Sequence, residues 1–180
     1  MSVSTPRPNI YLIGFMGTGK TTAGRMLAKR LRYTFIDTDK AIEEQESTPV
    51  KTIIEEKGLP HFRELEVAFI ESGHPHEACV VSCGGGLITN PGMMETLRGR
   101  GLVIAFFASV ETLLERTGRN DKRPLLNVEN PRERIEALLE ERTDIYKQAH
   151  VCISTDMRSI SDVAQQIGRT YDQFVRRMNG

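Results

Sequence analysis

The stretch Ile10-Tyr-Leu-Ile-Gly14-Phe-Met-Gly-Thr-Gly-Lys20-Thr-Thr22 decides the fold of this chain. Four apolar residues, Ile10 to Ile13, run without a break, as in a parallel strand buried on both faces. Gly14 then opens the pattern Gly-x-x-x-x-Gly-Lys-Thr, and apolar residues recur at helical spacing from Ala23 to Leu31. A glycine-rich loop between a buried strand and a helix is the setting that distinguishes a P-loop from a chance match.

Each residue type in this loop suits polyphosphate binding. Glycines let the backbone approach phosphates closely, and the helix that begins near Lys20 adds free N–H groups and its dipole. The Lys20 ammonium can contact the β- and γ-phosphates, and the Thr21 hydroxyl can ligate Mg²⁺. The alternative is a glycine-rich turn that merely starts a helix. We predict that ATP binds at six loop residues: Gly17, Thr18, Gly19, Lys20, Thr21 and Thr22.

Length and composition bound the remaining possibilities. The 180 residues suffice for one domain with a sizeable core, and 24 basic residues balance 24 acidic ones. This balance argues against a protein that wraps nucleic acid. No apolar run approaches the ~20 residues of a membrane span, and residues 1–9 hold no apolar core of a secretory signal. We expect a cytoplasmic monomer with three small, buried cysteines, Cys79, Cys83 and Cys152.

Strand and helix patterns alternate along the chain. Strand patterns cover 10–13, 33–36, 79–83, 102–108 and 151–153. Helical patterns cover 40–46, 50–57, 91–98, 110–116, 131–148 and 159–177, and a further helical face begins at Leu59. This alternation predicts an α/β fold, a single P-loop domain over 1–180 with a five-stranded parallel sheet flanked by helices. Ligands of such sheets bind beyond the carboxyl ends of the strands. The P-loop, Asp37, Asp39 and Gly84 to Gly86 should therefore share one rim.

Two carboxylates follow the second strand. Asp37 and Asp39 lie two residues apart, where one can hold a Mg²⁺-bound water and the other can accept a hydrogen bond from a substrate hydroxyl. An Asx turn with a helix cap at Asp39 explains the same residues, and both interpretations can hold together.

Two arginines point to an anionic substrate. Arg63 and Glu66 are neighbours on a helix, and Glu66 falls on its apolar face, where an ion pair would offset the cost of a lone carboxylate. A plain structural salt bridge fits equally well. Arg142 falls on the inward stripe of its own helix, between Leu138 and Tyr146, so it predicts an anionic partner. The alternative for Arg142 is a side chain that snorkels to the rim.

Two loops complete the candidate site. Gly84-Gly85-Gly86 directly follows a strand, which suggests either close approach of the backbone to a ligand or a tight turn. The segment 117–127 has no periodicity and contains Arg119, Lys122 and Arg123. We interpret it as a mobile lid that brings a cation over the transferred phosphate, rather than a solvated basic stretch.

These motifs together resemble shikimate kinase, of the nucleoside-monophosphate-kinase-like P-loop group, over nearly the whole chain. The resemblance rests on Gly14 to Gly24, Phe35-Ile-Asp-Thr-Asp39 with Ile42-Glu43, Phe62-Arg63 with Glu66, Gly84 to Gly86, Arg123-Pro-Leu-Leu126, and Arg142 with Tyr146. It implies that Lys20, Asp39 and Arg123 are catalytic and that Thr21 and Asp37 serve the metal. Shikimate would be held in the segment 38–73 and nearby, by Asp39, Arg63, Gly84, Gly85, Gly86 and Arg142. Nucleotide contacts would extend to Arg116, Arg123 and Arg158.

The chain departs from that family pattern at two places. Gly58-Leu-Pro-His61 stands where the family usually has Gly-Glu, and Thr143-Asp-Ile-Tyr146 stands where it usually has Pro-Leu-Tyr. Neither change removes a ligand, but Asp144 adds a negative charge near Arg142.

The predicted function is ATP- and Mg²⁺-dependent phosphorylation of the 3-hydroxyl of shikimate, in the pathway to aromatic amino acids. Two alternatives remain: another small-molecule P-loop kinase, such as a gluconate kinase, or a nucleotide-binding switch without catalysis. Asp39, Arg63 and Arg142 argue against the switch, because a switch needs no acceptor site.

Overall fold

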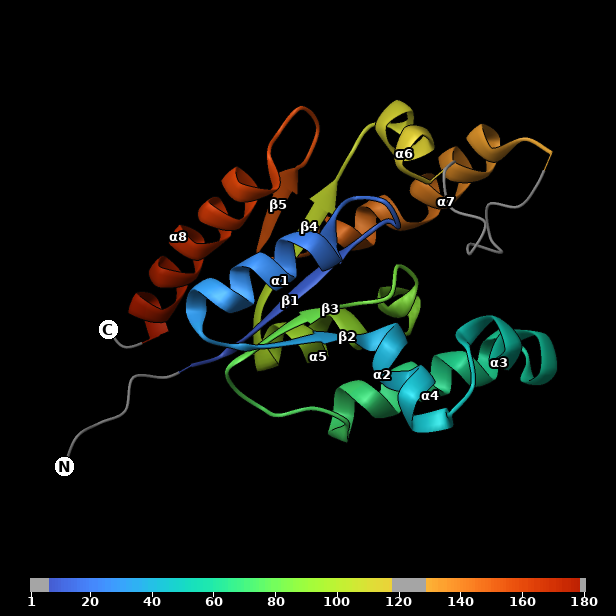
Figure 1. Cartoon of the computed structure of the whole chain (residues 1–180), viewed down its shortest axis with the longest axis horizontal. Helices are drawn as coiled ribbons and strands as arrows, with labels where there is room; N and C mark the ends of the chain where they lie inside the picture. Colours follow the sequence, from blue (N-terminus) through green and yellow to red (C-terminus); the bar gives the residue numbers. More distant parts are fainter. Residues whose placement is uncertain (1–6, 118–128, 179–180) are drawn as a thin grey trace.

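A computed structural model describes residues 7–117 and 129–178. Five parallel strands form one sheet in the order β2-β3-β1-β4-β5. The strands are β1 (Asn9–Gly14), β2 (Thr34–Asp37), β3 (Cys79–Ser82), β4 (Gly101–Phe107) and β5 (Val151–Ser154). The predicted α/β class and five-stranded parallel sheet are therefore confirmed (Figure 1).

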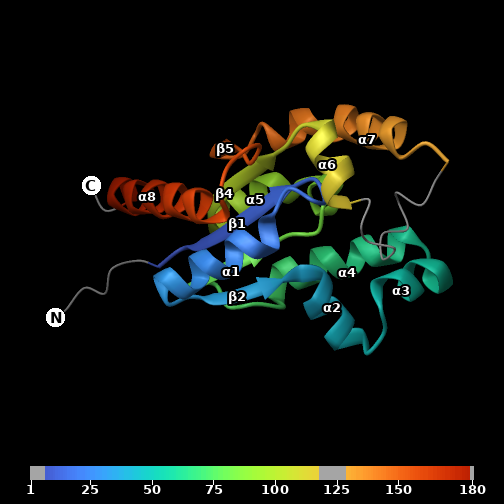
Figure 2. The ribbon, with the colours of Figure 1, turned by 45° about the horizontal axis from the view of Figure 1, so that its top comes forward.

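The helices follow the strands as the alternation predicted, although α2 to α4 come in succession after β2. They are α1 (Lys20–Leu31), α2 (Thr38–Glu46), α3 (Val50–Lys57), α4 (Leu59–Ser72), α5 (Met93–Arg100), α6 (Val110–Thr117), α7 (Pro131–Tyr146) and α8 (Ile160–Met178), with the 3-10 turn η1 (Leu87–Thr89). Figure 2 shows α2, α3 and α4 grouped beyond β2, with α8 at the opposite side of the molecule.

Strand β1 lies at the centre of the sheet, and every one of its six residues is buried. Ile10 and Leu12 face α1 and α8, whereas Tyr11 and Ile13 face the core beneath α4 and α5. Alternation of side chains along the strand thus feeds two apolar layers. Layers on both faces explain why the strand has no polar alternation in its sequence.

Two local expectations need correction, and one element was missed. Helix α2 begins at Thr38 with Asp37 at its N-cap position, so the cap predicted at Asp39 is wrong, and Asp39 lies in the first turn instead. Helix α5 begins at Met93 rather than Pro91, because Gly92 has the left-handed φ of 76°. The 3-10 turn η1 after the three glycines was not predicted at all.

The cysteines follow the prediction at two of three positions. Cys79 and Cys83 are buried around β3, an inner strand of the sheet, as expected. Cys152 is exposed, so the prediction of burial is wrong there. It lies on β5, which forms one edge of the sheet and, among the described strands, pairs only with β4.

Other boundaries follow local sequence signals. Asn130 caps α7, its side chain accepting from the Glu133 N–H, and Pro131 occupies the first turn. Gly58 has a φ of 86° and separates α3 from α4, with a proline in the first turn of α4. The unusual Leu59-Pro60 is thereby accommodated as the start of a helix.

Candidate active site

The P-loop connects β1 to α1 and has the backbone that its glycines predict. Gly17 and Gly19 adopt φ values of 82° and 94°, which side-chain-bearing residues avoid. Gly14 is required for another reason: a Cβ there would clash with the carbonyl oxygen of Phe106 on β4. The first glycine of the motif thus serves sheet packing, while the later ones shape the loop.

The side chains of Lys20 and Thr18 both donate hydrogen bonds to backbone carbonyls of the P-loop. The Lys20 Nζ donates to the carbonyl oxygens of Gly14 at 2.8 Å and Phe15 at 2.9 Å, so the ammonium lies across the loop. The Thr18 hydroxyl donates to the Phe15 carbonyl at 2.8 Å and is buried. Thr18 therefore braces the loop through its side chain, whereas Thr22 is exposed on the first turn of α1.

Thr21 and Asp37 meet beside the loop. The Thr21 hydroxyl donates to Asp37 Oδ2 at 2.9 Å, and the Ser82 hydroxyl at the end of β3 lies 3.4 Å from it. Mg²⁺ in kinases takes one or two protein oxygens and completes its shell with phosphate and water. This hydroxyl–carboxylate pair fits that requirement. No group of three or more His, Cys, Asp or Glu side chains able to hold a metal occurs in the described residues.

Asp39 lies on the first turn of α2, facing the same rim. Burial and the nearby carboxylate of Asp37 raise the pKa of Asp39 to about 6, while the Lys20 ammonium opposes the rise. Such a carboxylate is a better proton acceptor near neutral pH than an ordinary aspartate, because its conjugate acid is weaker.

Arg63 and Glu66 form the ion pair that the helical spacing predicted. Glu66 is only 1 % exposed, and its Oε1 has no hydrogen-bond partner within the described part of the chain. Burial raises the pKa of Glu66 to about 7, against the pull of Arg63. The pair fixes the Arg63 guanidinium against the glycine turn, since a Cβ at Gly86 would overlap that guanidinium.

Gly84 and Gly86 are closely approached by protein side chains, whereas a Cβ at Gly85 would meet nothing nearer than 3.6 Å. A Cβ at Gly84 would lie 2.5 Å from Asp39 Oδ1 and 2.8 Å from Glu66 Oε1. The Gly84 N–H also donates to the Thr38 hydroxyl at 2.9 Å. Thr38 was not singled out from the sequence, where nothing connects it to residue 84. The turn therefore gathers side chains from α2 and α4 onto the end of β3.

Arg142 points inward from α7 and is only 5 % exposed, so it does not snorkel to the rim. Its guanidinium donates to the Gly85 carbonyl oxygen at 3.3 Å, and its Nε has no hydrogen-bond partner among the residues described. Asp144, in contrast, is exposed and pairs with Lys147 at 3.1 Å. The added negative charge therefore faces solvent rather than Arg142.

Arg116 and Arg158 lie on the far side of the P-loop and do not meet. Arg116 donates to the Gly17 carbonyl at 3.3 Å and to the hydroxyl and carbonyl oxygens of Thr155 at 3.1 Å and 3.2 Å. Arg158 instead turns to the Gln166 side chain on α8. The buried Thr155 is a further residue that sequence patterns gave no reason to select.

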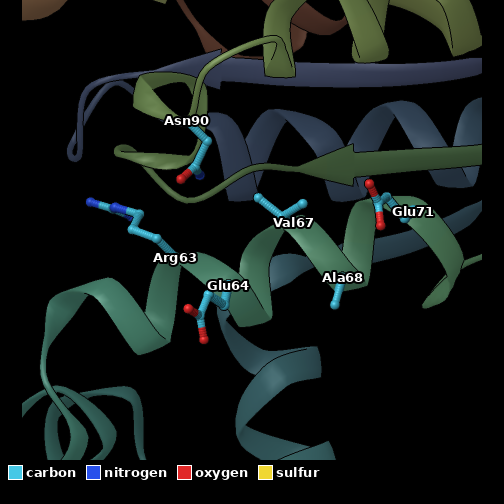
Figure 3. A pocket seen from close by; sticks show the side chains of 6 residues that line it. All are labelled: Arg63, Glu64, Val67, Ala68, Glu71 and Asn90. Atoms are coloured by element: carbon cyan, nitrogen blue, oxygen red, sulfur yellow. The ribbon is translucent and has the colours of Figure 1, made fainter.

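Two surface hollows in the described part of the chain lie beside α4 and β2, and neither is lined by the P-loop. One of about 300 Å³ lies between α4 and the loop after η1, and Figure 3 shows Arg63 and Val67 on the side of α4 nearer to Asn90. The other, of about 560 Å³, lies beside β2 and is lined by residues that include Arg25, Phe35 and Lys40.

Arg123 and the predicted lid, apart from Thr117, lie outside the described residues. None of the described helices is long and apolar enough to cross a membrane.

A P-loop at the carboxyl edge of a parallel sheet, faced by Asp39, Arg63 and Arg142, defines a P-loop protein of the small-molecule kinase class. A sequence model of the family described as SKI, shikimate kinase, matches residues 16–172. The chain belongs to the shikimate kinase family.

Individual relatives agree with this assignment. Proteins named shikimate kinase from Sulfurihydrogenibium sp. (strain YO3AOP1) and Thermoanaerobacter pseudethanolicus are 43 % and 41 % identical to the chain, over 88 % and 91 % of it and 95 % of the length of each relative. A structure titled as shikimate kinase from Acinetobacter baumannii in complex with shikimate has a TM-score of 0.87 and 40 % identity, covering 92 % of this chain and 93 % of that one.

A gluconokinase structure from Sinorhizobium meliloti 1021 shares the fold with less similarity. Its TM-score is 0.59 and its identity is 17 %, over 95 % of this chain and 97 % of that one. This level of identity reflects the common P-loop architecture and carries no information about the acceptor.

Proposed function

We propose that this protein transfers the γ-phosphoryl group of ATP to the 3-hydroxyl of shikimate, giving shikimate 3-phosphate for aromatic amino acid synthesis. Family membership supports the reaction class. The observation that carries the choice of acceptor is the buried Arg142, whose Nε has no hydrogen-bond partner among the described residues and which lies near Arg63 and Glu66. A guanidinium in such a position requires an anion, and the shikimate carboxylate supplies one.

Asp39 is the group that orients the acceptor hydroxyl and takes its proton. Its carboxylate faces Lys20 and the glycine turn, and its raised pKa suits a base that works near neutral pH. The transition state of phosphoryl transfer is loose, so the main task is to hold the hydroxyl in line with the γ-phosphorus. The hydroxyl proton passes to a carboxylate oxygen of Asp39 as the new P–O bond forms, while the bond between the γ-phosphorus and the bridging oxygen breaks and ADP leaves with that oxygen.

The P-loop and Lys20 hold the phosphates. The Lys20 ammonium, held on two loop carbonyls, is placed to move onto the β- and γ-phosphate oxygens with little reorganisation. Thr21 and Asp37 would hold Mg²⁺. A Mg²⁺ ion held by these two residues would supply positive charge to the transferred phosphate.

The acceptor lies on the opposite side of this centre. In our assignment α2 to α4, within 38–73, and the turn Gly84 to Gly86 surround shikimate, with Arg63 and Arg142 on its carboxylate. Arg116 and Arg158 border the nucleotide base, and Arg123 of the segment 117–127 contributes a cation to the transferred phosphate. The role of Arg123 rests on the sequence alone. Outside the site, we propose a cytoplasmic monomer that binds neither nucleic acid nor membrane.

An acceptor panel tests the proposal directly. ADP release is measured with ATP, Mg²⁺ and the purified protein, with shikimate, gluconate, a nucleoside monophosphate or no acceptor. We expect rapid release with shikimate alone. Preference for gluconate would assign another kinase of the same fold, and equal release without acceptor would assign a nucleotide-hydrolysing switch.

A further inference from the structure

The carbonyl oxygen of Gly85 accepts hydrogen bonds from two side chains of α7. The Tyr146 hydroxyl donates to it at 2.7 Å, and the Arg142 guanidinium donates to it at 3.3 Å. The first is a well-formed bond and the second lies at the long limit of a hydrogen bond. Tyr146 therefore already satisfies the carbonyl without any help from Arg142.

Tyr146 is held firmly for this task. It is 1 % exposed at the last residue of α7, and its ring meets Phe107 at the end of β4 edge-on, with centroids 6.2 Å apart and an angle of 88°. Burial raises the pKa of Tyr146 to about 12, so its hydroxyl remains a donor throughout the physiological range.

Arg142 contacts the Gly85 carbonyl less closely than Tyr146 does. Its guanidinium also interacts with the Tyr146 hydroxyl, and its Nε lies 3.9 Å from the exposed carboxylate of Glu141. Its buried Nε has no hydrogen-bond partner in the described structure. A guanidinium with five donors and one long carbonyl bond can be drawn onto an incoming carboxylate at small cost.

We infer that Tyr146 is a positioning residue for the acceptor: by occupying the Gly85 carbonyl, its hydroxyl leaves the Arg142 guanidinium available to the substrate carboxylate. This inference rests on the proposed role of Arg142 as a carboxylate ligand. Without the Tyr146 hydroxyl, Arg142 would be the remaining side-chain donor to the Gly85 carbonyl in the described structure, and this carbonyl would compete with the substrate for the guanidinium. The phosphate side of the site does not depend on this bond.

The test is Tyr146→Phe, which removes the hydroxyl and keeps the ring. We expect KM for shikimate to rise about fivefold to tenfold, the equilibrium effect of losing one buried hydrogen bond. KM for ATP and kcat should change less than about twofold, because the phosphate side does not depend on the bond. A KM for shikimate equal to that of the unaltered protein would overturn the inference.

A matched control is Tyr11→Phe. Tyr11 is also fully buried and its hydroxyl also bonds within the protein, to His74 Nε2 at 3.0 Å, but it faces the core beneath α4 and α5. Tyr11→Phe should lower the melting temperature without changing KM for shikimate. If both substitutions raise KM equally, the effect is one of general stability and the inference fails.

A double-mutant cycle shows whether Tyr146 acts through Arg142. In an Arg142→Leu background, Tyr146→Phe should change KM for shikimate by less than about twofold, because its target is gone. An undiminished effect in that background would contradict the inference. If Tyr146→Phe does not fold, Phe107→Leu is measured in the same cycle, because it removes the ring that packs against Tyr146. An unchanged KM for shikimate in Phe107→Leu would then contradict the inference.

The cycle also separates this inference from the proposed function. If the unaltered protein does not phosphorylate shikimate, the proposed function fails. If it does, and Arg142→Leu weakens shikimate binding while Tyr146→Phe has no effect, only the inference about Tyr146 fails.

Discussion

Asp39 and Glu66, from two different helices, converge on the Cα of Gly84. A Cβ at that position would lie 2.5 Å from Asp39 Oδ1 and 2.8 Å from Glu66 Oε1. The pKa of each carboxyl is raised, chiefly by burial, and the Asp39 carboxylate raises the pKa of Glu66 further. The glycine turn thus holds a proton acceptor and a buried acid side by side, with Arg63 as the nearby counter-charge.

Gly84→Ala should damage activity more than stability. The atoms in conflict are side-chain oxygens, which can move, so we expect a loss of only about 1–2 kcal/mol in the free energy of unfolding. Displacing the Asp39 carboxylate should lower kcat by about 10- to 100-fold. The control is Gly99→Ala on α5, where a Cβ meets nothing within 4 Å and activity should be unchanged. Normal turnover in Gly84→Ala would show that Asp39 is not held by this contact.

Glu66 should make stability depend on pH. Its pKa is raised from the ordinary 4.5 to about 7, so between these values the folded protein holds a proton that the unfolded chain releases. The free energy of unfolding should therefore fall as pH rises through that window, by about 1–3 kcal/mol. In Glu66→Gln this component should be absent. Denaturant titrations of both proteins at about pH 5 and pH 7.5 measure it, and parallel pH dependences would contradict the assignment.

Asp39 should govern turnover. A base must be ionised to accept the hydroxyl proton, so kcat/KM should fall as pH falls through about 6, the pKa of Asp39 in the free protein. Asp39→Asn keeps the shape of the side chain and should abolish turnover with an unchanged circular dichroism spectrum. If the variant retains activity, the carboxylate has only a structural place in the first turn of α2.

Thr155 should act on the nucleotide side through Arg116. Its buried hydroxyl accepts from Arg116 and donates to the Phe107 carbonyl, which ties the P-loop carbonyl of Gly17 to the end of the sheet. Thr155→Val should raise KM for ATP about threefold to tenfold and leave KM for shikimate unchanged. Thr155→Ser should restore the KM for ATP. A Thr155→Val protein with normal kinetics would show that this bridge is dispensable.

The sequence predicted those features whose causes are local. The P-loop is contiguous, and the inward direction of Arg142 and the pairing of Arg63 with Glu66 follow from helical spacing. The N-cap of α2 is also local, but it lies at Asp37 and not at Asp39, where the alternative interpretation placed it.

Contacts between distant segments were not predictable in this way. The bond from Tyr146 to Gly85 spans 61 residues, and the bond from Arg116 to Thr155 spans 39. Their geometry depends on how α7 packs against the rest of the fold and on where β5 ends in the sheet, and no local sequence pattern encodes either. The same applies to Gly84: the sequence indicated a close approach, and only the fold identifies Asp39 and Glu66 as what approaches.

The central claim is that Arg142 binds the carboxylate of the acceptor, and calorimetric titration tests it most directly. The unaltered protein and Arg142→Leu are each titrated with shikimate and with its neutral carboxamide. We expect Arg142→Leu to weaken shikimate binding by about 2–5 kcal/mol, because one partner of a desolvated charge pair is lost. It should largely abolish the discrimination between acid and amide, with ATP affinity and melting temperature nearly unchanged. An Arg142→Leu protein that melts at a lower temperature yet binds shikimate normally would contradict the claim and make Arg142 a structural residue.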